Sequence, residues 1–263
     1  MNLELSGQVT VIVGGARGLG FAIASAFAAE NARVVLLDLS PEVEAAAKQL
    51  GGGGFIIDVA DYPAVQARAE AIRAQFGRVD HVVFAAGIGS GKFGFPFWKL
   101  EPSDWPRILN VNLIGAVNIA HAFAPQMAEA GAGTFLFLAS VAGQIGSQTD
   151  PPYSASKAGL INFAQCAAKD LAPFGVRVNA LNPGMVKTPL NRSVWQAWAD
   201  RQPAETRLDY DAWTAEKIAK LVPLNRWQTP EDVAAMAVFL ASTRAANITG
   251  QTINVDGGYV MHS

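Results

Sequence analysis

The sequence predicts one α/β domain, a doubly wound parallel sheet of seven strands with helices on both faces. Short β-branched runs alternate with longer helical stretches along the whole chain, and this alternation produces right-handed crossovers between parallel strands. No linker-like stretch or internal repeat divides the 263 residues. The chain is therefore expected to form a single domain over 1–263.

The predicted strands have few polar residues, as expected for strands that are covered on both faces. They span residues 9–13, 33–37, 54–57, 81–84, 134–139, 176–181 and 251–255. The predicted helices, which follow helical periodicity, span residues 19–29, 42–50, 64–76, 103–130, 154–173 and 231–242. We interpret the glycines of 51–54 as a turn between a helix and a strand.

Two segments, 88–102 and 185–228, interrupt this alternation. Loops of this kind in α/β proteins lie at the carboxyl ends of the strands, where ligands bind. The segment at about 185–228 is mostly helical and is expected to form a substrate lid. Its tryptophans either contact the substrate or pack the lid, and these are Trp195, Trp198, Trp213 and Trp227.

The composition excludes several classes of protein. The chain is 51% hydrophobic and 16% charged, with a net charge of −2 and no block of like charges, so we expect no nucleic-acid partner. No uninterrupted apolar run approaches the ~20 residues of a membrane span, so no membrane partner is expected. The N-terminus lacks the features of a signal peptide, which favours a cytoplasmic location.

Cysteine and histidine usage predicts neither a disulfide nor a metal site. Cys166 is the single cysteine, and it falls within an apolar helical pattern, which predicts a buried packing residue. The histidines, His81, His121 and His262, are scattered and have no partner residues at ligand spacing.

A glycine-rich turn follows the first predicted strand. Gly14, Gly18 and Gly20 open a helix, and glycines there allow a tight turn and a close approach of the backbone to a pyrophosphate. The helix N-terminus supplies amide donors and the positive end of a dipole. Such a turn is weak evidence alone, but at the start of a parallel sheet it predicts a dinucleotide site.

Asp38 ends the second strand and predicts NAD rather than NADP as the cofactor. Its carboxylate can accept the ribose hydroxyls and would repel a 2′-phosphate. Arg17 favours the opposite preference, but the residue after Asp38 is the uncharged Leu39. Asp58, after the third strand, either bonds the adenine or caps the helix that starts near Pro63.

Tyr153 and Lys157 lie four residues apart, on one face of one predicted helix. A nearby ammonium favours the phenolate and lowers the pKa of a tyrosine from about 10. Ser140 ends the fifth strand, where its hydroxyl would bond a substrate oxygen. Asn112 lies within a long helix and is expected to hold a water that relays protons to Lys157.

With these motifs the sequence resembles the short-chain dehydrogenase/reductase family, which has a Rossmann-type fold, over essentially its whole length. The resemblance implies that Asn112, Ser140, Tyr153 and Lys157 form the catalytic tetrad, with Tyr153 as general acid/base and Lys157 also on the nicotinamide ribose. It implies a homotetramer as well. The implied cofactor-binding residues are Gly14, Arg17, Gly18, Leu19, Gly20, Asp38, Asp58, Val59, Ala86, Gly87, Tyr153, Lys157, Pro183, Gly184, Val186 and Thr188.

Two positions depart from the pattern of the family. Val13 replaces the usual threonine before the first glycine, and Phe84-Ala85 replaces a pair of asparagines before Ala86-Gly87. The lost groups stabilise strand ends and loops, so we expect altered local stability and unchanged chemistry.

The leading prediction is NAD-dependent oxidation of a secondary alcohol, with polyols or sugar alcohols first. Substrate choice is assigned to segment 88–102, to segment 185–228 and to Gln144, Ile145 and Gln148. The alternatives are an NADPH-dependent reductase of 3-oxoacyl thioesters or ketones, and a redox sensor that binds NAD(H) without turnover. Basic residues of the lid leave a phosphorylated substrate open, and these are Arg192, Arg201, Arg207, Lys217 and Lys220.

Overall fold

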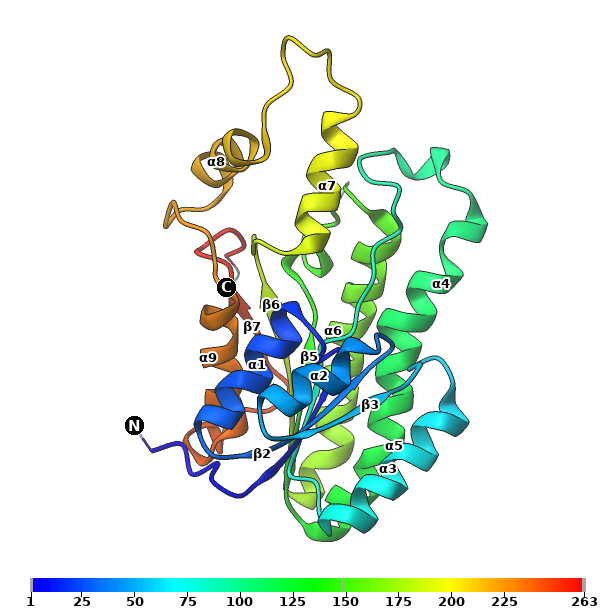
Figure 1. Ribbon diagram of the computed structural model, residues 1–263, viewed down its shortest axis with the longest axis vertical. Helices are drawn as coiled ribbons and strands as arrows, with labels where there is room; N and C mark the ends of the chain where they lie inside the picture. Colours follow the sequence, from blue (N-terminus) through cyan, green and yellow to red (C-terminus); the bar gives the residue numbers. More distant parts are fainter. Residues whose placement is uncertain (1, 148, 262–263) are drawn as a thin grey trace.

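Seven parallel strands form one sheet in the computed structural model, which describes residues 2–147 and 149–261. The strand order is β3-β2-β1-β4-β5-β6-β7, so the chain winds in both directions from β1 and β4 (Figure 1). The strands are β1 (Val9–Val13), β2 (Arg33–Asp38), β3 (Gly53–Ile56), β4 (His81–Phe84), β5 (Gly133–Leu138), β6 (Val176–Pro183) and β7 (Thr252–Val255). The predicted doubly wound Rossmann-type domain is confirmed.

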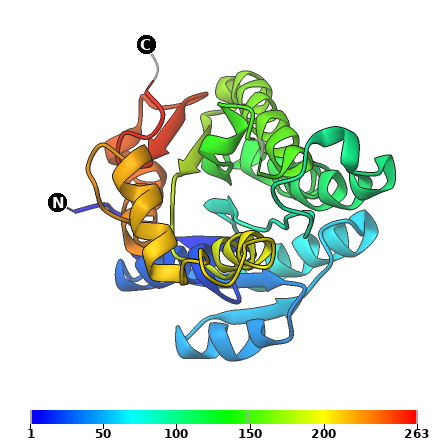
Figure 2. The same cartoon turned by 90° about the horizontal axis from the view of Figure 1, so that it is seen from above.

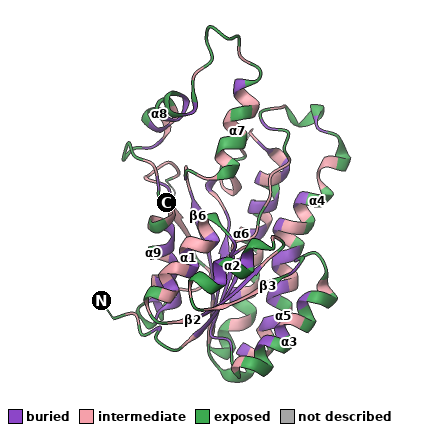
Figure 3. Ribbon diagram, in the orientation of Figure 1, coloured by how far each residue is buried: buried purple, intermediate pink, exposed green. Residues whose placement is uncertain are grey.

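Helices cover both faces of the sheet, as the buried residues show in Figure 3. One apolar core unites the sheet with α3, α5 and α6, and the other unites it with α1, α2 and α9. The helices are α1 (Gly18–Ala29), α2 (Glu42–Gln49), α3 (Tyr62–Phe76), α4 (Pro106–Leu109), α5 (Gly115–Ala130), α6 (Pro151–Leu171), α7 (Pro189–Ala199), α8 (Tyr210–Leu221) and α9 (Pro230–Ala241).

The segment 185–228 forms α7 and α8, which stand beyond the carboxyl edge of the sheet (Figures 1 and 2). Val186 and Gln228, close to its two ends, pair in an isolated parallel bridge. Both ends of the segment are therefore held together where the sheet ends.

The predicted helix 103–130 is interrupted, which corrects our expectation of one continuous helix. After α4 the chain makes a π-helical turn over Asn110–Ile114 before α5 begins. By length and hydropathy alone, the stretch Pro102–Ala130 could cross a membrane. Here Ile119, Phe123 and Met127 are fully buried in the core beneath the sheet, and a core helix has the same composition.

Cys166 is exposed, and the prediction of a buried residue was wrong. Helix α6 presents Leu160, Ala164 and Ala168 to the core. Position 166 is two residues from 164 and points to another side of the helix. Among the described residues, no group of three or more His, Cys, Asp or Glu side chains has a metal-site arrangement. His262 and Gln148 lie outside the described residues.

The first two glycines of 51–54 form the predicted turn, but Gly53 and Gly54 already belong to β3. A side chain at Gly54 would meet the carbonyl of Val43 at 2.5 Å. The helix α2 therefore packs directly against the backbone of this strand.

His81 is buried at the start of β4, at the amino edge of the sheet. Its Nδ1 pairs with Thr134 Oγ1 at 2.8 Å and its Nε2 with Gln8 Oε1. Burial lowers the pKa of His81 from 6.5 to about 4. The native protein therefore keeps this ring neutral in a pH range where the unfolded chain protonates it.

We predict that this ring makes unfolding depend on pH. As the pH falls from 6.5 towards 4, the unfolded chain binds a proton that the native state excludes, so up to about 3 kcal/mol of stability is lost in this window. Urea unfolding at several pH values should show a shallower loss for His81→Gln than for the wild type. Equal pH slopes in both proteins would contradict the prediction.

Candidate active site at the carboxyl edge of the sheet

The turn between β1 and α1 is a cradle of backbone atoms. Gly14 has φ +82°, and a Cβ there would meet the Ala86 nitrogen at 2.6 Å. A Cβ at Gly20 would meet the Gly14 carbonyl oxygen at 2.0 Å, whereas the position beside Gly18 (φ +59°) is open. No side chain caps the first amides of α1. This surface fits a dinucleotide pyrophosphate, which backbone N–H groups at a helix N-terminus bind.

Asp38 lies beside this cradle at the end of β2. Its Oδ2 accepts the N–H of Ala16 at 3.0 Å and its Oδ1 accepts the N–H of Ser40 at 2.9 Å. The two bonds fix a carboxylate where the sequence places the adenosine ribose. Arg17 is exposed on the same turn and Leu39 is 65% exposed.

Asp58 and Val59 follow β3 at the next strand end. The exposed Asp58 accepts the N–H of Ala60 at 2.9 Å, and α3 is capped by Asp61, which accepts the Ala64 N–H. The reading of Asp58 as a helix cap was therefore wrong. Val59 is buried against Gly115, where a Cβ would meet its Cγ2 at 2.6 Å.

The end of β6 closes the far side of the site. Pro183 is buried at the strand end and Gly184 follows it. A Cβ at Gly184 would fall 2.6 Å from that of Asp256. The Thr188 hydroxyl accepts the Asn191 N–H at 3.2 Å and thereby caps α7.

Lys157 is a buried cation behind the reaction centre. Its Nζ donates to the Leu138 carbonyl at 2.6 Å and lies 5.5 Å from the centre of the Tyr153 ring. Burial lowers the pKa of Lys157 to about 8. A Cβ at Gly87 would lie 3.4 Å from Nζ, so a side chain at 87 would crowd the ammonium.

Asn112 sits in the π-helical turn and joins three parts of the site. Its Oδ1 accepts the Ile88 N–H at 2.8 Å, and its Nδ2 donates to the Ile88 carbonyl at 2.9 Å and to Ser156 Oγ at 3.0 Å. π-turns inside helices are frequent at functional sites. The amide therefore ties the loop after β4 to α6, a positioning role that the sequence pattern did not reveal.

Ser140 and Tyr153 meet at the reaction centre. The Ser140 hydroxyl accepts the Ala142 N–H at 3.1 Å, and its hydrogen bond with Tyr153 lowers the pKa of the phenol. Burial is the larger effect and raises that pKa to about 12. We expected a lowered pKa, and for the protein alone that prediction is wrong: burial, together with the negative charge of Asp150, outweighs the effect of the Ser140 hydroxyl.

Two serines that the sequence analysis missed hold α6 in place. Ser154 Oγ donates to the Ala142 carbonyl at 2.5 Å and accepts the Ser147 N–H at 3.0 Å. Ser156 Oγ donates to the Tyr153 carbonyl at 2.7 Å. Both serines lie between Tyr153 and Lys157, and their place inside this motif was the one sign in the sequence that they belong to the site.

Tyr153 borders a cavity of about 180 Å³ beneath α7 and α8. Its apolar wall includes Val141, Ile145, Met185, Leu190 and Trp213. Its polar side chains include two that the sequence analysis did not assign to the cavity, Asp150 and Asn191, as well as Lys217. Asp150 directly precedes two prolines. This pattern is typical of an ordinary helix start, so the sequence alone gives no sign that Asp150 lines the cavity.

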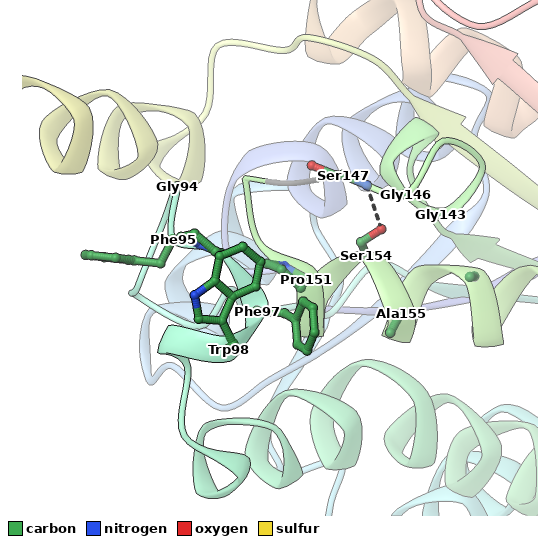
Figure 4. A pocket seen from close by; sticks show the side chains of 12 residues that line it. Gly94, Phe95, Phe97, Trp98, Gly143, Gly146, Ser147, Pro151, Ser154 and Ala155 are labelled. Carbon is green, nitrogen blue, oxygen red and sulfur yellow. Dashed lines mark hydrogen bonds between the residues drawn. The ribbon is translucent and has the colours of Figure 1, made fainter.

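A larger cavity, of about 640 Å³, lies on the other side of the 146–151 segment. Figure 4 shows the rings of Phe97 and Trp98 between the 94–98 segment and the first turn of α6, where Ser154 bonds Ser147. Neither Ser140 nor Tyr153 lines it. Segment 88–102 therefore contributes to both cavities: Phe93 lines the smaller one and Phe95 the larger one.

For the tryptophans of segment 185–228, the sequence left substrate contact and packing open, and most of them pack against the protein. Trp195 and Trp227 contact Tyr210, and Trp198 contacts Trp213, the only one of the four tryptophans that lines the small cavity. Three arginines are also engaged. Arg192 stacks on Tyr210, Arg201 donates to the Gly94 carbonyl and Arg207 to the Gln202 carbonyl.

Known proteins resemble the chain over its whole length. A family model described as enoyl-(acyl carrier protein) reductase matches residues 14–260. D-threitol dehydrogenase of Mycolicibacterium smegmatis is 37% identical over 266 residues, covering 99% of this chain and 95% of that protein. A 3-oxoacyl-[acyl-carrier-protein] reductase of Thermotoga maritima is 32% identical over 265 residues, covering 98% and 100%.

The structural comparison agrees with these relatives. L-sorbose reductase from Gluconobacter frateurii, solved with NADPH and L-sorbose, superposes with a TM-score of 0.90 at 29% identity, and the match covers 100% of both chains. The doubly wound parallel sheet is the fold expected from the sequence resemblance. This chain therefore belongs to the short-chain dehydrogenase/reductase family and is an oxidoreductase that uses a nicotinamide cofactor.

Proposed function

We propose that this protein oxidises a secondary alcohol of a polyol or sugar alcohol, and reduces the corresponding ketone, with NAD as the preferred cofactor. The observation that carries the proposal is the Tyr153 phenol at the wall of a small cavity, near enough to the Ser140 hydroxyl for that group to lower its pKa, with the Lys157 ammonium 5.5 Å from the centre of its ring. The D-threitol dehydrogenase and L-sorbose reductase relatives support the substrate class.

The proposed proton path begins at the substrate hydroxyl. Ser140 and Tyr153 would bind its oxygen, and Tyr153 would take the proton as general base during oxidation and return it during reduction. Lys157 stabilises the phenolate by its charge. Asn112 keeps the loop after β4 and helix α6 in register through Ile88 and Ser156. When bound, the nicotinamide ring supplies the hydride acceptor or donor.

The cofactor would lie across the strand ends. The backbone of Gly14, Gly18, Leu19 and Gly20 would hold the pyrophosphate, and Lys157 the nicotinamide ribose. Asp58 and Val59 would adjoin the adenine, Ala86 and Gly87 the centre of the molecule. Pro183, Gly184, Val186 and Thr188 would border the nicotinamide.

The preference for NAD rests on Asp38. Its carboxylate is held by two backbone N–H groups and would repel a 2′-phosphate. The sorbose reductase was solved with NADPH, and the Arg17 guanidinium would favour NADP by binding its 2′-phosphate. Asp38 is the fixed group of the two, so we favour NAD.

Two alternative functions are supported less well. The 3-oxoacyl reductase relatives favour an NADPH-dependent thioester reductase, but Asp38 is unfavourable for NADPH. A redox sensor without turnover would have no need for a Tyr153 phenol bonded to Ser140 with a buried lysine behind it.

The proposal is tested by assaying the purified protein with polyols, simple secondary alcohols and 3-oxoacyl thioesters, each with NAD(H) and NADP(H). We expect the highest kcat/KM for a polyol with NAD. Tyr153→Phe should lower kcat by about 100-fold or more, because it removes the acid/base hydroxyl, while NADH binding measured by fluorescence stays close to wild type. Faster thioester reduction with NADPH would contradict the proposal, and binding without any turnover would favour the sensor.

Replacing Asp38 should change the cofactor preference. Asp38→Ala removes the charge that repels a 2′-phosphate, so kcat/KM with NADP should rise and that with NAD should fall, each by about tenfold, for a charge effect on the order of 1.4 kcal/mol at a partly exposed site. Glu42→Ala, an exposed carboxylate at the start of α2, is the matched control. An unchanged ratio in Asp38→Ala would show that Asp38 does not set the preference.

A further inference from the structure

Asp150 has a carboxylate oxygen without a partner at the wall of the small cavity. The residue is 5% exposed, three positions before Tyr153 on the same chain segment. Its Oδ2 accepts the Ser90 N–H at 2.8 Å, whereas its Oδ1 is buried and makes no hydrogen bond to any described residue. A buried acceptor left unpaired is unfavourable, so a donor is expected on the cavity side.

The simplest structural explanation, a helix cap, does not account for this side chain. Asp150 occupies the N-cap position of α6, and the Tyr153 N–H lies near enough to lower the pKa of its carboxylate, but the side chain makes no cap hydrogen bond of good geometry. Instead, the loop after β4 is shaped around the carboxylate. Ser90 donates its N–H, and a Cβ at Gly89 would lie 2.9 Å from Oδ2. The fold therefore holds one oxygen in place and leaves the other without a partner, in a residue that lines the cavity.

Lys217 provides the complementary group in the same cavity. It is half-buried on α8, lies 4.1 Å from the centre of the Trp213 ring and forms no ion pair among the described residues. Burial lowers the pKa of Lys217, whereas burial raises that of Asp150, opposed by the N–H groups of Ser90 and Tyr153. The cavity thus offers a hydrogen-bond acceptor and a hydrogen-bond donor beside the reacting phenol.

We propose that Asp150 is a specificity residue that accepts a hydrogen bond from a second hydroxyl of the substrate, next to the carbinol that reacts, and that Lys217 donates to another. This inference rests on the proposed function and narrows it to neutral polyhydroxylated substrates. A phosphate or carboxylate group would be repelled by Asp150. A simple alcohol would leave Oδ1 unpaired, and an ammonium would meet Lys217 as a like charge.

A cavity of about 180 Å³ is small beside the ~300–1,000 Å³ of sites for drug-sized ligands. A short polyol fits this size. It places a hydroxyl next to every carbinol, so one oxygen can reach Tyr153 while its neighbour reaches Asp150.

The test compares Asp150→Asn with the wild type on two alcohols of equal chain length, threitol and sec-butanol. The amide keeps the size of the side chain and an oxygen for the Ser90 N–H, but removes the negative charge from the free acceptor. We expect kcat/KM for threitol to fall about 10- to 100-fold, the effect of losing a hydrogen bond to a charged group. The value for sec-butanol should stay within about twofold.

Lys217→Met gives a second reading, because it leaves α6 unchanged. It should lower kcat/KM for threitol by about three- to tenfold and leave sec-butanol almost unaffected. Asp170→Asn and Lys220→Met, exposed residues on α6 and α8, are the matched controls and should behave as wild type. NADH binding by fluorescence checks that each variant is folded.

The outcomes separate this inference from the proposed function. Equal losses on both alcohols would show that Asp150 acts through Tyr153 or through the loop after β4, and would overturn the inference alone. A wild type that oxidises sec-butanol as well as threitol would overturn it also. A wild type that oxidises no alcohol would contradict the proposed function, and the inference with it.

Discussion

All seven strands run in the same direction, so their carboxyl ends and the loops that follow them meet at one edge of the sheet. Parallel pairing sets this constraint before any catalytic side chain is considered. The strand ends carry Asp38, Ala86-Gly87, Ser140 and Pro183-Gly184. Residues far apart in the sequence therefore face one site, although few of them contact one another.

Helix α6 brings the residues of the proposed reaction centre to that edge. Lys157 Nζ bonds the Leu138 carbonyl at the end of β5, and Ser154 bonds the Ala142 carbonyl just beyond it. Asn112 bonds both Ile88 after β4 and Ser156 on α6. These four hydrogen bonds place Tyr153 beside Ser140. They also explain why polar groups are tolerated in a buried region, since each is satisfied by a backbone or side-chain partner.

The sequence was sufficient to predict the strands and the doubly wound fold, because β-branched runs are local signals. The Gly and Tyr–Lys spacings, which are local signals too, predicted the candidate site residues. The sequence was insufficient wherever the local structure depends on a contact with residues far away in the sequence. The π-helical turn at Asn112 depends on Ile88 and Ser156, and the exposure of Cys166 depends on which side of α6 meets the sheet. The free oxygen of Asp150 depends on how the loop at Gly89 and Ser90 folds.

The pKa of Tyr153 is the property that tests the proposed proton transfer most directly. Burial raises it to about 12 in the protein alone, but general-base catalysis near neutral pH needs a much lower value. The measurement is the tyrosinate absorbance of wild type minus that of Tyr153→Phe, over a range of pH, with and without NAD. We expect the extra tyrosinate to appear near pH 12 without NAD and at a clearly lower pH with it, because the oxidised ring is positively charged. The same titration in both conditions would contradict the role of Tyr153 as the proton-transferring group.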